Sequence, residues 1–164
     1  MTSLLKRRPN ANNPVHLVTP QNAGWSYVGF ALYRLAAGDH IEAGTGTREA
    51  CLVIVSGAAR LLGSGKDFGV QGGRANPFDG LPDSLYVPAK SRYRIEAETD
   101  CEIAICTAPA HGSLPLRLIP AAEVGQETRG AGTNTRYVRN ILPDTSPHAE
   151  SLLVVEVITP GGHW

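Results

Sequence analysis

The sequence has few cysteines, few aromatic residues, no excess of either charge and no long apolar run. Its 164 residues include three cysteines, and 15 Lys and Arg residues balance 15 Asp and Glu residues. A balanced charge predicts no basic surface for nucleic acid or an anionic membrane. No stretch has the length and hydropathy of a membrane span, and the opening MTSLLKRR does not resemble a signal peptide. We therefore expect a cytoplasmic protein with a small-molecule partner, and neither a nucleic-acid nor a membrane partner.

The three cysteines stand in apolar segments rather than in a close pair with metal-ligand spacing. Cys51 lies in ACLVIV, and Cys101 and Cys106 lie in TDCEIAICTA. An odd number of cysteines does not form a complete disulfide framework. We predict that all three are reduced residues of the core.

Short segments rich in Val, Ile, Leu and Tyr alternate with glycine and proline along most of the chain. This pattern predicts many short strands, and hence an all-β sandwich or closed barrel with one core. At most one short helical turn, at 120–123, is expected. The expected strands cover residues 15–18, 26–35, 49–56, 58–62, 84–87, 92–98, 101–107, 116–119, 136–141 and 152–159.

An internal repeat appears when the chain is shifted by 141 − 18 = 123 residues. The shift places Val18-Thr19-Pro20 on Ile141-Leu142-Pro143, and without a gap it places residues 30–39 on residues 153–162. Two strands and a following glycine turn therefore recur in the same register. The repeat predicts a first barrel that ends near Asn140 and a second barrel that has only begun at Trp164.

Two segments fit the motif frames of cupins but lack the cupin ligands. In the first frame, Gly38 and Gly57 enclose a segment in which Gly44 and Gly46 occupy the two histidine positions. Glu49 lies next to the carboxylate position, which is Ala50. In the second frame, over residues 88–97, Tyr93 replaces the last histidine.

These positions offer one carboxylate and one phenol, whereas a divalent transition metal needs three or four converging donors. We therefore predict that the first barrel binds no metal. We interpret Tyr93 as an amphipathic residue that fills the barrel mouth, with an acid–base role as the alternative.

Five segments together resemble the N-terminal part of the 5-deoxyglucuronate isomerase family, the bicupins of inositol catabolism. The uronate isomerases of pectin breakdown are more distant relatives. The resemblance runs from residue 15 to residue 164, and its last two segments are the most specific. The segments are GWSYVGFALYRLAAGD, REACLVIVSGAA, DGLPDSLYVPA, NTRYVRNILPD and ESLLVVEVITPGGHW.

The resemblance implies a cupin jelly-roll barrel that forms the first half of a bicupin, followed by the opening strands of a second barrel. Residues 1–14 would be an N-terminal arm, residues 15–140 a barrel without metal ligands, and residues 141–164 the start of a truncated second cupin. It also implies a homo-oligomer, and a divalent metal of the zinc or manganese type in the missing second barrel.

The activity implied for the complete enzyme is the aldose–ketose isomerisation of 5-deoxy-glucuronate, a sugar acid, to 5-keto-2-deoxygluconate. The chain by itself would be inactive, and no catalytic residue is assigned to it. One alternative is a stand-alone sugar-binding or dimerisation module. Another is a metal-independent epimerase, which needs a buried histidine–carboxylate pair.

Arg129, Arg136, Arg139 and Asn140 cluster where the first barrel leads into the second. A guanidinium group can bind a sugar-acid carboxylate through two hydrogen bonds. Arginines in such a segment also bind carbonyl and carboxylate groups of a neighbouring domain, so both roles stay open. His163 has no second ligand near it in sequence and is interpreted as an ordinary polar residue.

The segment LLVVEVI, residues 152–158, is almost continuously apolar. Such a strand is normally covered on both faces, and an uncovered one pairs readily with another chain. We expect the chain to self-associate through this strand, or to insert the strand into its own or a neighbour's sheet.

Overall fold

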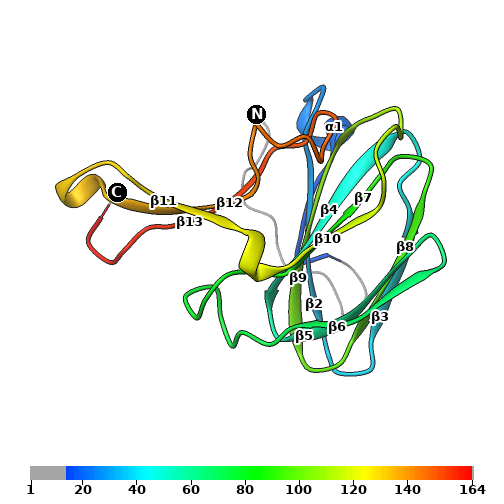
Figure 1. The fold of residues 1–164 in the computed structure, drawn as a ribbon, viewed down its shortest axis with the longest axis horizontal. Coiled ribbons are helices and arrows are strands. Elements are labelled where there is room, and N and C mark those ends of the chain that lie inside the picture. The colour runs from blue at the N-terminus through cyan, green and yellow to red at the C-terminus, as the bar shows by residue number, and fades with distance from the viewer. Residues whose placement is uncertain (1–13, 164) are drawn as a thin grey trace.

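The computed structural model describes residues 14–163 and shows an all-β protein, as predicted. Two antiparallel sheets face each other and form the barrel, and a third sheet projects from it as an arm (Figure 1). We call these sheet A, sheet B and the arm sheet. The N-terminal arm expected over residues 1–14 lies, apart from Pro14, outside the described residues.

Each sheet has a simple strand order. Sheet A runs β1 (His16–Val18), β2 (Gly29–Leu35), β9 (Cys101–Pro109), β4 (Arg48–Ser56), β7 (Ser84–Val87), β10 (Arg117–Ile119). Sheet B runs β3 (His40–Gly44), β8 (Arg92–Ala97), β5 (Ala58–Gly63), β6 (Lys66–Gly72). The arm sheet runs β11 (Gly125–Arg129), β12 (Arg136–Leu142), β13 (Val154–Ile158). The helical segments are short: α1 (Pro20–Ala23), η1 (Ala121–Glu123), η2 (Gly132–Asn134).

All ten expected strands are confirmed, with ends that differ by a few residues. The sequence analysis missed β3, β6 and β11, whose residues are mostly exposed or half-buried and therefore lack a run of apolar side chains. The expectation of at most one helical turn was wrong. Helix α1 begins at Pro20 with a capping box, in which Thr19 and Asn22 each bind the other's backbone N–H.

Side chains of β4 alternate between two apolar cores, because successive residues of a strand point to opposite faces. Ala50, Leu52 and Ile54 point into the barrel, between sheets A and B. Cys51 and Val53 point to the outer face of sheet A. That outer cluster also contains residues from the arm sheet and from the segments that connect it to the barrel, among them Val124, Ile141, Leu142, Leu152 and Val154.

The outer cluster therefore joins the arm to the barrel. The three cysteines behave as predicted, since all are free, Cys51 and Cys101 are buried and Cys106 is half-buried. Burial raises the pKa of both Cys101 and Cys106 to about 11, so these thiols are protonated at neutral pH.

The internal repeat has a counterpart in the structure. Strands β1 and β2 pair antiparallel, with Leu17 opposite Ala31, and β12 and β13 also pair antiparallel. The shift of 123 carries Leu17 to Asn140 and Ala31 to Val154, so an identical ladder would place Asn140 opposite Val154. Asn140 instead lies opposite Val155. The difference of one residue accompanies a register shift in the ladder between Asn140 and Leu142.

Strand β13 is an edge strand of the arm sheet and is covered on one face only. Val154 is buried in the outer cluster. On the other side, Leu153, Val155 and Val157 are 55%, 39% and 46% exposed. As expected for a segment whose usual cover is missing, one of its faces is left exposed within residues 14–163.

Candidate functional site

The positions of the cupin metal ligands carry almost no donor atoms. Gly44 ends β3, and Gly46 occupies the following turn at a positive φ of 58°. Tyr93 points into the barrel core from β8. Among residues 14–163 no group of three or more His, Cys, Asp or Glu side chains is placed to hold a metal ion. The described residues therefore do not fit a divalent metal, which the family resemblance assigns to the second barrel.

Glu49 does not face the barrel mouth, so the expectation that its carboxylate belongs there was wrong. Ala50 points into the barrel, and its neighbour Glu49 must point to the outer face of sheet A. There the carboxylate is fully buried, and it accepts a hydrogen bond of 2.7 Å from the Tyr86 hydroxyl. It also accepts the backbone N–H groups of Glu150, Ser151 and Leu152 at 2.9, 2.7 and 2.6 Å.

Glu150, whose backbone N–H binds Glu49, uses its own carboxylate to bind a loop of the barrel side. Its carboxylate accepts the backbone N–H groups of His111, Gly112 and Ser113 at 2.7, 2.8 and 2.8 Å. These bonds, with the one from His111 contributing most, lower the pKa of Glu150 to about 2. Glu49 and Glu150 together form what we call the carboxylate clasp, which fixes the segment that precedes β13 against the barrel.

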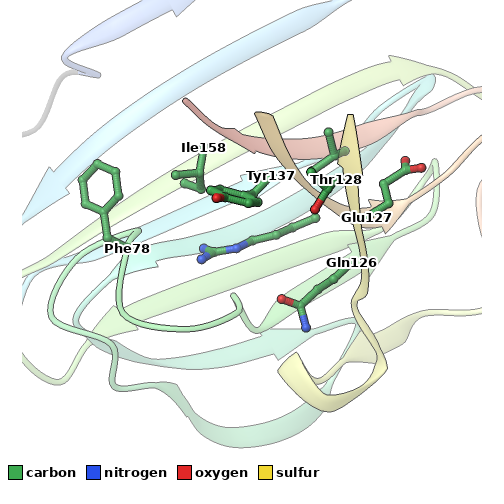
Figure 2. Close-up of a pocket in the computed structure, with 8 residues that line it drawn as sticks. Phe78, Gln126, Glu127, Thr128, Tyr137 and Ile158 are labelled. Atoms are coloured by element: carbon green, nitrogen blue, oxygen red, sulfur yellow. The ribbon is translucent and has the colours of Figure 1, made fainter. Parts of the chain in front are cut away.

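A cavity of about 550 Å³ lies on one face of the arm sheet. Figure 2 shows Tyr137 and Ile158 side by side on this face, with Phe78 facing them from the loop between β6 and β7. Gln126 and Thr128 of β11 also line the cavity. We call this the arm cavity.

Arg139 belongs to the arm cavity and is held by an ion-pair cluster. Its guanidinium donates to Glu156 at 2.6 Å and also to the Pro77 carbonyl. Arg74, beyond the end of β6, binds the same Glu156 carboxylate through two hydrogen bonds of 2.6 and 2.9 Å. The Arg74, Arg139 and Glu156 side chains are only 5%, 12% and 15% exposed, so water screens the cluster weakly.

The other predicted site residues lie elsewhere on the arm sheet. Arg129 and Arg136 are direct cross-strand neighbours, and both are exposed. Arg129 and Asn140 donate to Glu127, and Arg136 donates to Asn134. The structure thus brings Arg129 and Arg136 together, while Arg139 forms a separate cluster.

His163 stands apart from these residues, with its Nδ1 3.3 Å from the Thr135 carbonyl oxygen. Sequence reasoning missed Arg74 and Glu156. A lone glutamate inside the apolar segment LLVVEVI was a usable signal, because a buried carboxylate needs a partner. No sequence pattern pointed to Arg74, which lies 82 residues from Glu156.

A second cavity, of about 240 Å³, opens where inward-facing residues of β2, β4, β8 and β9 meet beneath α1. We call this end of the barrel the barrel mouth. Its lining includes Tyr33, Arg48, Tyr93 and Thr107, and Arg48 is the only charged residue among those that line it. The barrel mouth includes the position of Tyr93, which replaces the last histidine of the cupin motif.

The sequence matches the KduI/IolB family over residues 3–164. The chain belongs to this family. It is 48% identical to a protein of Geobacillus kaustophilus and 46% identical to one of Geobacillus thermodenitrificans, each over 157 residues, and both relatives are named 5-deoxy-glucuronate isomerase. These matches cover 95% of this chain but only 56% and 57% of the two relatives. The chain therefore spans little more than half of their length.

Two solved structures are also similar to this KduI/IolB family chain. The crystal structure of an IolB-like protein from Salmonella typhimurium has a TM-score of 0.88 and 46% identity, and covers 92% of this chain and 57% of its own. The protein YlbA from Escherichia coli has a TM-score of 0.53 at 20% identity and shares the fold alone. Within residues 14–163, no helix has the length and hydropathy needed to cross a membrane.

Proposed function

We propose that this chain is the N-terminal half of an aldose–ketose isomerase that converts 5-deoxy-glucuronate to 5-keto-2-deoxygluconate in myo-inositol catabolism. The observation that supports this is the match to the KduI/IolB family over almost the whole chain, together with 48% identity to a relative named for this reaction. The fold that goes with this proposal is the first cupin jelly roll of a bicupin, with residues 141–164 opening the second.

The proposed reaction moves a proton between neighbouring carbon atoms, which requires a base and stabilisation of an enediol-like transition state. The residues in the barrel and the arm do not form such a set, since the Glu49 carboxylate is fully used by the carboxylate clasp. We therefore propose that the base and any metal ligands belong to the part of the relatives that this chain does not match. On this proposal the chain alone is inactive.

We propose that the chain contributes a rigid arm on which the rest of the enzyme is assembled. The carboxylate clasp holds the segment that precedes β13, and the Arg74–Glu156–Arg139 cluster holds the middle of the strand. Fixed backbone of this kind keeps site residues within the tolerance that catalysis requires.

A chimaera tests the proposed activity. Residues 1–164 would replace the matched segment of the Geobacillus kaustophilus relative, and NMR would follow the conversion of 5-deoxy-glucuronate. We expect the chimaera to retain at least a tenth of the activity of the intact relative. The chain alone should give none, and so should the relative without its matched segment. A chimaera that folds but shows no isomerisation would contradict the proposal.

The role of Arg139 can be decided in the same chimaera. Arg139→Lys should raise the Michaelis constant sharply if the side chain binds the substrate carboxylate, and should lower stability if it only holds Glu156. We propose the second outcome, because its guanidinium already binds Glu156 and Pro77. Arg129→Lys, at an exposed position of the arm, is the matched control.

We also propose a cytoplasmic homo-oligomer. Three free cysteines fit a reducing compartment, and the exposed Val155 and Val157 lie on an edge strand that another copy could cover. Light scattering after size exclusion should show a larger particle for the chain than for its Val155→Lys/Val157→Lys variant. Two monomeric samples would contradict association through this strand.

A further inference from the structure

We propose that the barrel mouth binds a small carboxylate that carries hydroxyl groups, such as a monosaccharide acid, directly through Arg48, Tyr33 and Tyr93 and without a metal ion. This site lies within the barrel and is separate from the arm cavity. The proposal rests on the chemistry of the lining residues and does not require the isomerase activity.

The polar side chains converge because each occupies an inward-facing position on its own strand. Tyr33 lies on β2, Arg48 begins β4, Tyr93 lies on β8 and Thr107 lies on β9. Gly29 of β2 makes room for two of them. A Cβ atom at Gly29 would lie 2.5 Å from Thr107 Oγ1 and 3.4 Å from Arg48 Nη2.

Arg48 is a half-buried cation that has no carboxylate partner among residues 14–163. Its Nε donates to Thr107 Oγ1 at 3.1 Å, and its Nη2 donates to the carbonyl groups of Thr107 and Tyr27. These bonds fix the guanidinium in place but do not neutralise it. Burial also lowers the pKa of Arg48, which shows that the charged form loses hydration here. An anion would supply the missing partner.

The two phenol groups have unused hydrogen-bonding capacity. Tyr93 is 8% exposed and Tyr33 is half-buried, yet neither hydroxyl has a hydrogen-bond partner within the described residues. Neither hydroxyl oxygen is among the fully buried atoms that lack a partner, so both remain accessible to a ligand in the cavity. Burial, with a smaller effect from the nearby Tyr33, raises the pKa of Tyr93 to about 12, and burial also raises the pKa of Tyr33. Both groups are therefore protonated donors at neutral pH.

The rest of the lining limits the size and type of ligand. The cavity of about 240 Å³ is below the ~300 Å³ at which drug-sized sites begin, so it suits a small compound. Its walls include Phe30, Ala31 and Ile105, which can pack against C–H groups. A planar guanidinium favours a carboxylate, and phenol and threonine hydroxyls favour hydroxyl groups. A sugar acid combines these features, whereas a neutral sugar leaves Arg48 unpaired.

Isothermal titration of the 164-residue chain in EDTA tests the site with D-glucuronate, D-glucose and acetate as probes. We expect D-glucuronate to bind at least tenfold more tightly than either D-glucose or acetate, because only D-glucuronate offers both the carboxylate and the hydroxyl groups. Chelation should not change its affinity. Loss of binding in EDTA, or equal affinity for D-glucuronate and D-glucose, would overturn the proposal.

Substitutions locate the binding. Arg48→Gln should weaken D-glucuronate binding at least tenfold, and Tyr33→Phe and Tyr93→Phe should each weaken it roughly threefold to tenfold. The two phenylalanine variants should fold normally, since neither hydroxyl binds the protein, so they remain informative if Arg48→Gln unfolds. Tyr137→Phe in the arm cavity is the matched control and should bind normally. A reversed pattern, with Tyr137→Phe impaired and both barrel variants normal, would place the ligand elsewhere and refute this site.

Discussion

The barrel buries apolar side chains between two sheets, whereas the arm sheet packs one end against the barrel and leaves all of β11 exposed. Two polar groupings, the carboxylate clasp and the Arg74–Glu156–Arg139 cluster, supply much of the attachment between the two regions. The barrel should therefore unfold as one cooperative unit, and the arm should open locally at a lower free energy. The comparison shows that the body relies on apolar burial, whereas the connection adds directional bonds to the apolar outer cluster.

The largest loss of global stability should come from the barrel core. Leu61 is fully buried between sheets A and B, so Leu61→Ala should lower the free energy of unfolding by about 3–5 kcal/mol, because it leaves a cavity. Urea denaturation followed by circular dichroism would measure this. Val70→Ala, on an exposed position of β6, should change stability by less than about 1 kcal/mol. Equal losses for the two variants would contradict a core centred on Leu61.

Removal of the carboxylate clasp should cause the second-largest loss of stability, and the loss should be concentrated where the arm is attached to the barrel. Glu49→Ala leaves the Tyr86 hydroxyl and three backbone N–H groups without their acceptor, at a cost of about 2–4 kcal/mol. Hydrogen exchange should speed up at residues 150–152 more than in β5 or β8. Glu98→Ala, at an exposed position, is the control. Uniformly faster exchange in both regions would show that the arm is not a separate unit.

The ion-pair cluster should have a smaller effect that is confined to the arm. Glu156→Gln removes the charge that Arg74 and Arg139 share, and we expect a loss of about 2 kcal/mol because the cluster is mostly buried. Faster hydrogen exchange in β12 and β13 would be the signature. Glu127→Gln near the tip of the arm should leave both strands unchanged. Unaltered hydrogen exchange in the Glu156→Gln variant would show that this cluster does not attach the arm to the barrel.

The smallest effect should depend on pH. The pKa of Glu150 is lowered from 4.5 to about 2, so its bonds to residues 111–113 stabilise the folded state fully above pH 4.5. This contribution is lost as the pH falls towards 2. The gap in thermal midpoint between the wild type and Glu150→Gln should be constant above about pH 5 and close between pH 4.5 and 2. Glu98→Gln should show no such gap, and a gap that persists at pH 2 would contradict this role.

The sequence predicted most of the fold where the pattern of apolar residues is strong. All ten predicted strands occur, and the cysteines lie in or against apolar cores, although there are two cores where one was predicted. Polar strands such as β3 and β11 were missed because hydrogen bonds to neighbouring strands, rather than apolar side chains, define them. Among the candidate site residues, the sequence pointed to Arg139 but could not reveal Arg74, since spacing along the chain does not report contacts over 82 residues.

The sequence by itself determined the β-rich character, the internal repeat, the absence of histidine at the cupin motif positions and the family resemblance. Only the tertiary structure decided which way each side chain points. Glu49 and Ala50 are adjacent in sequence, but the alternation of β4 sends one to the carboxylate clasp and the other into the barrel. The same alternation brings Arg48, Tyr33 and Tyr93 to one cavity from three strands, because register and sheet packing set which residues meet.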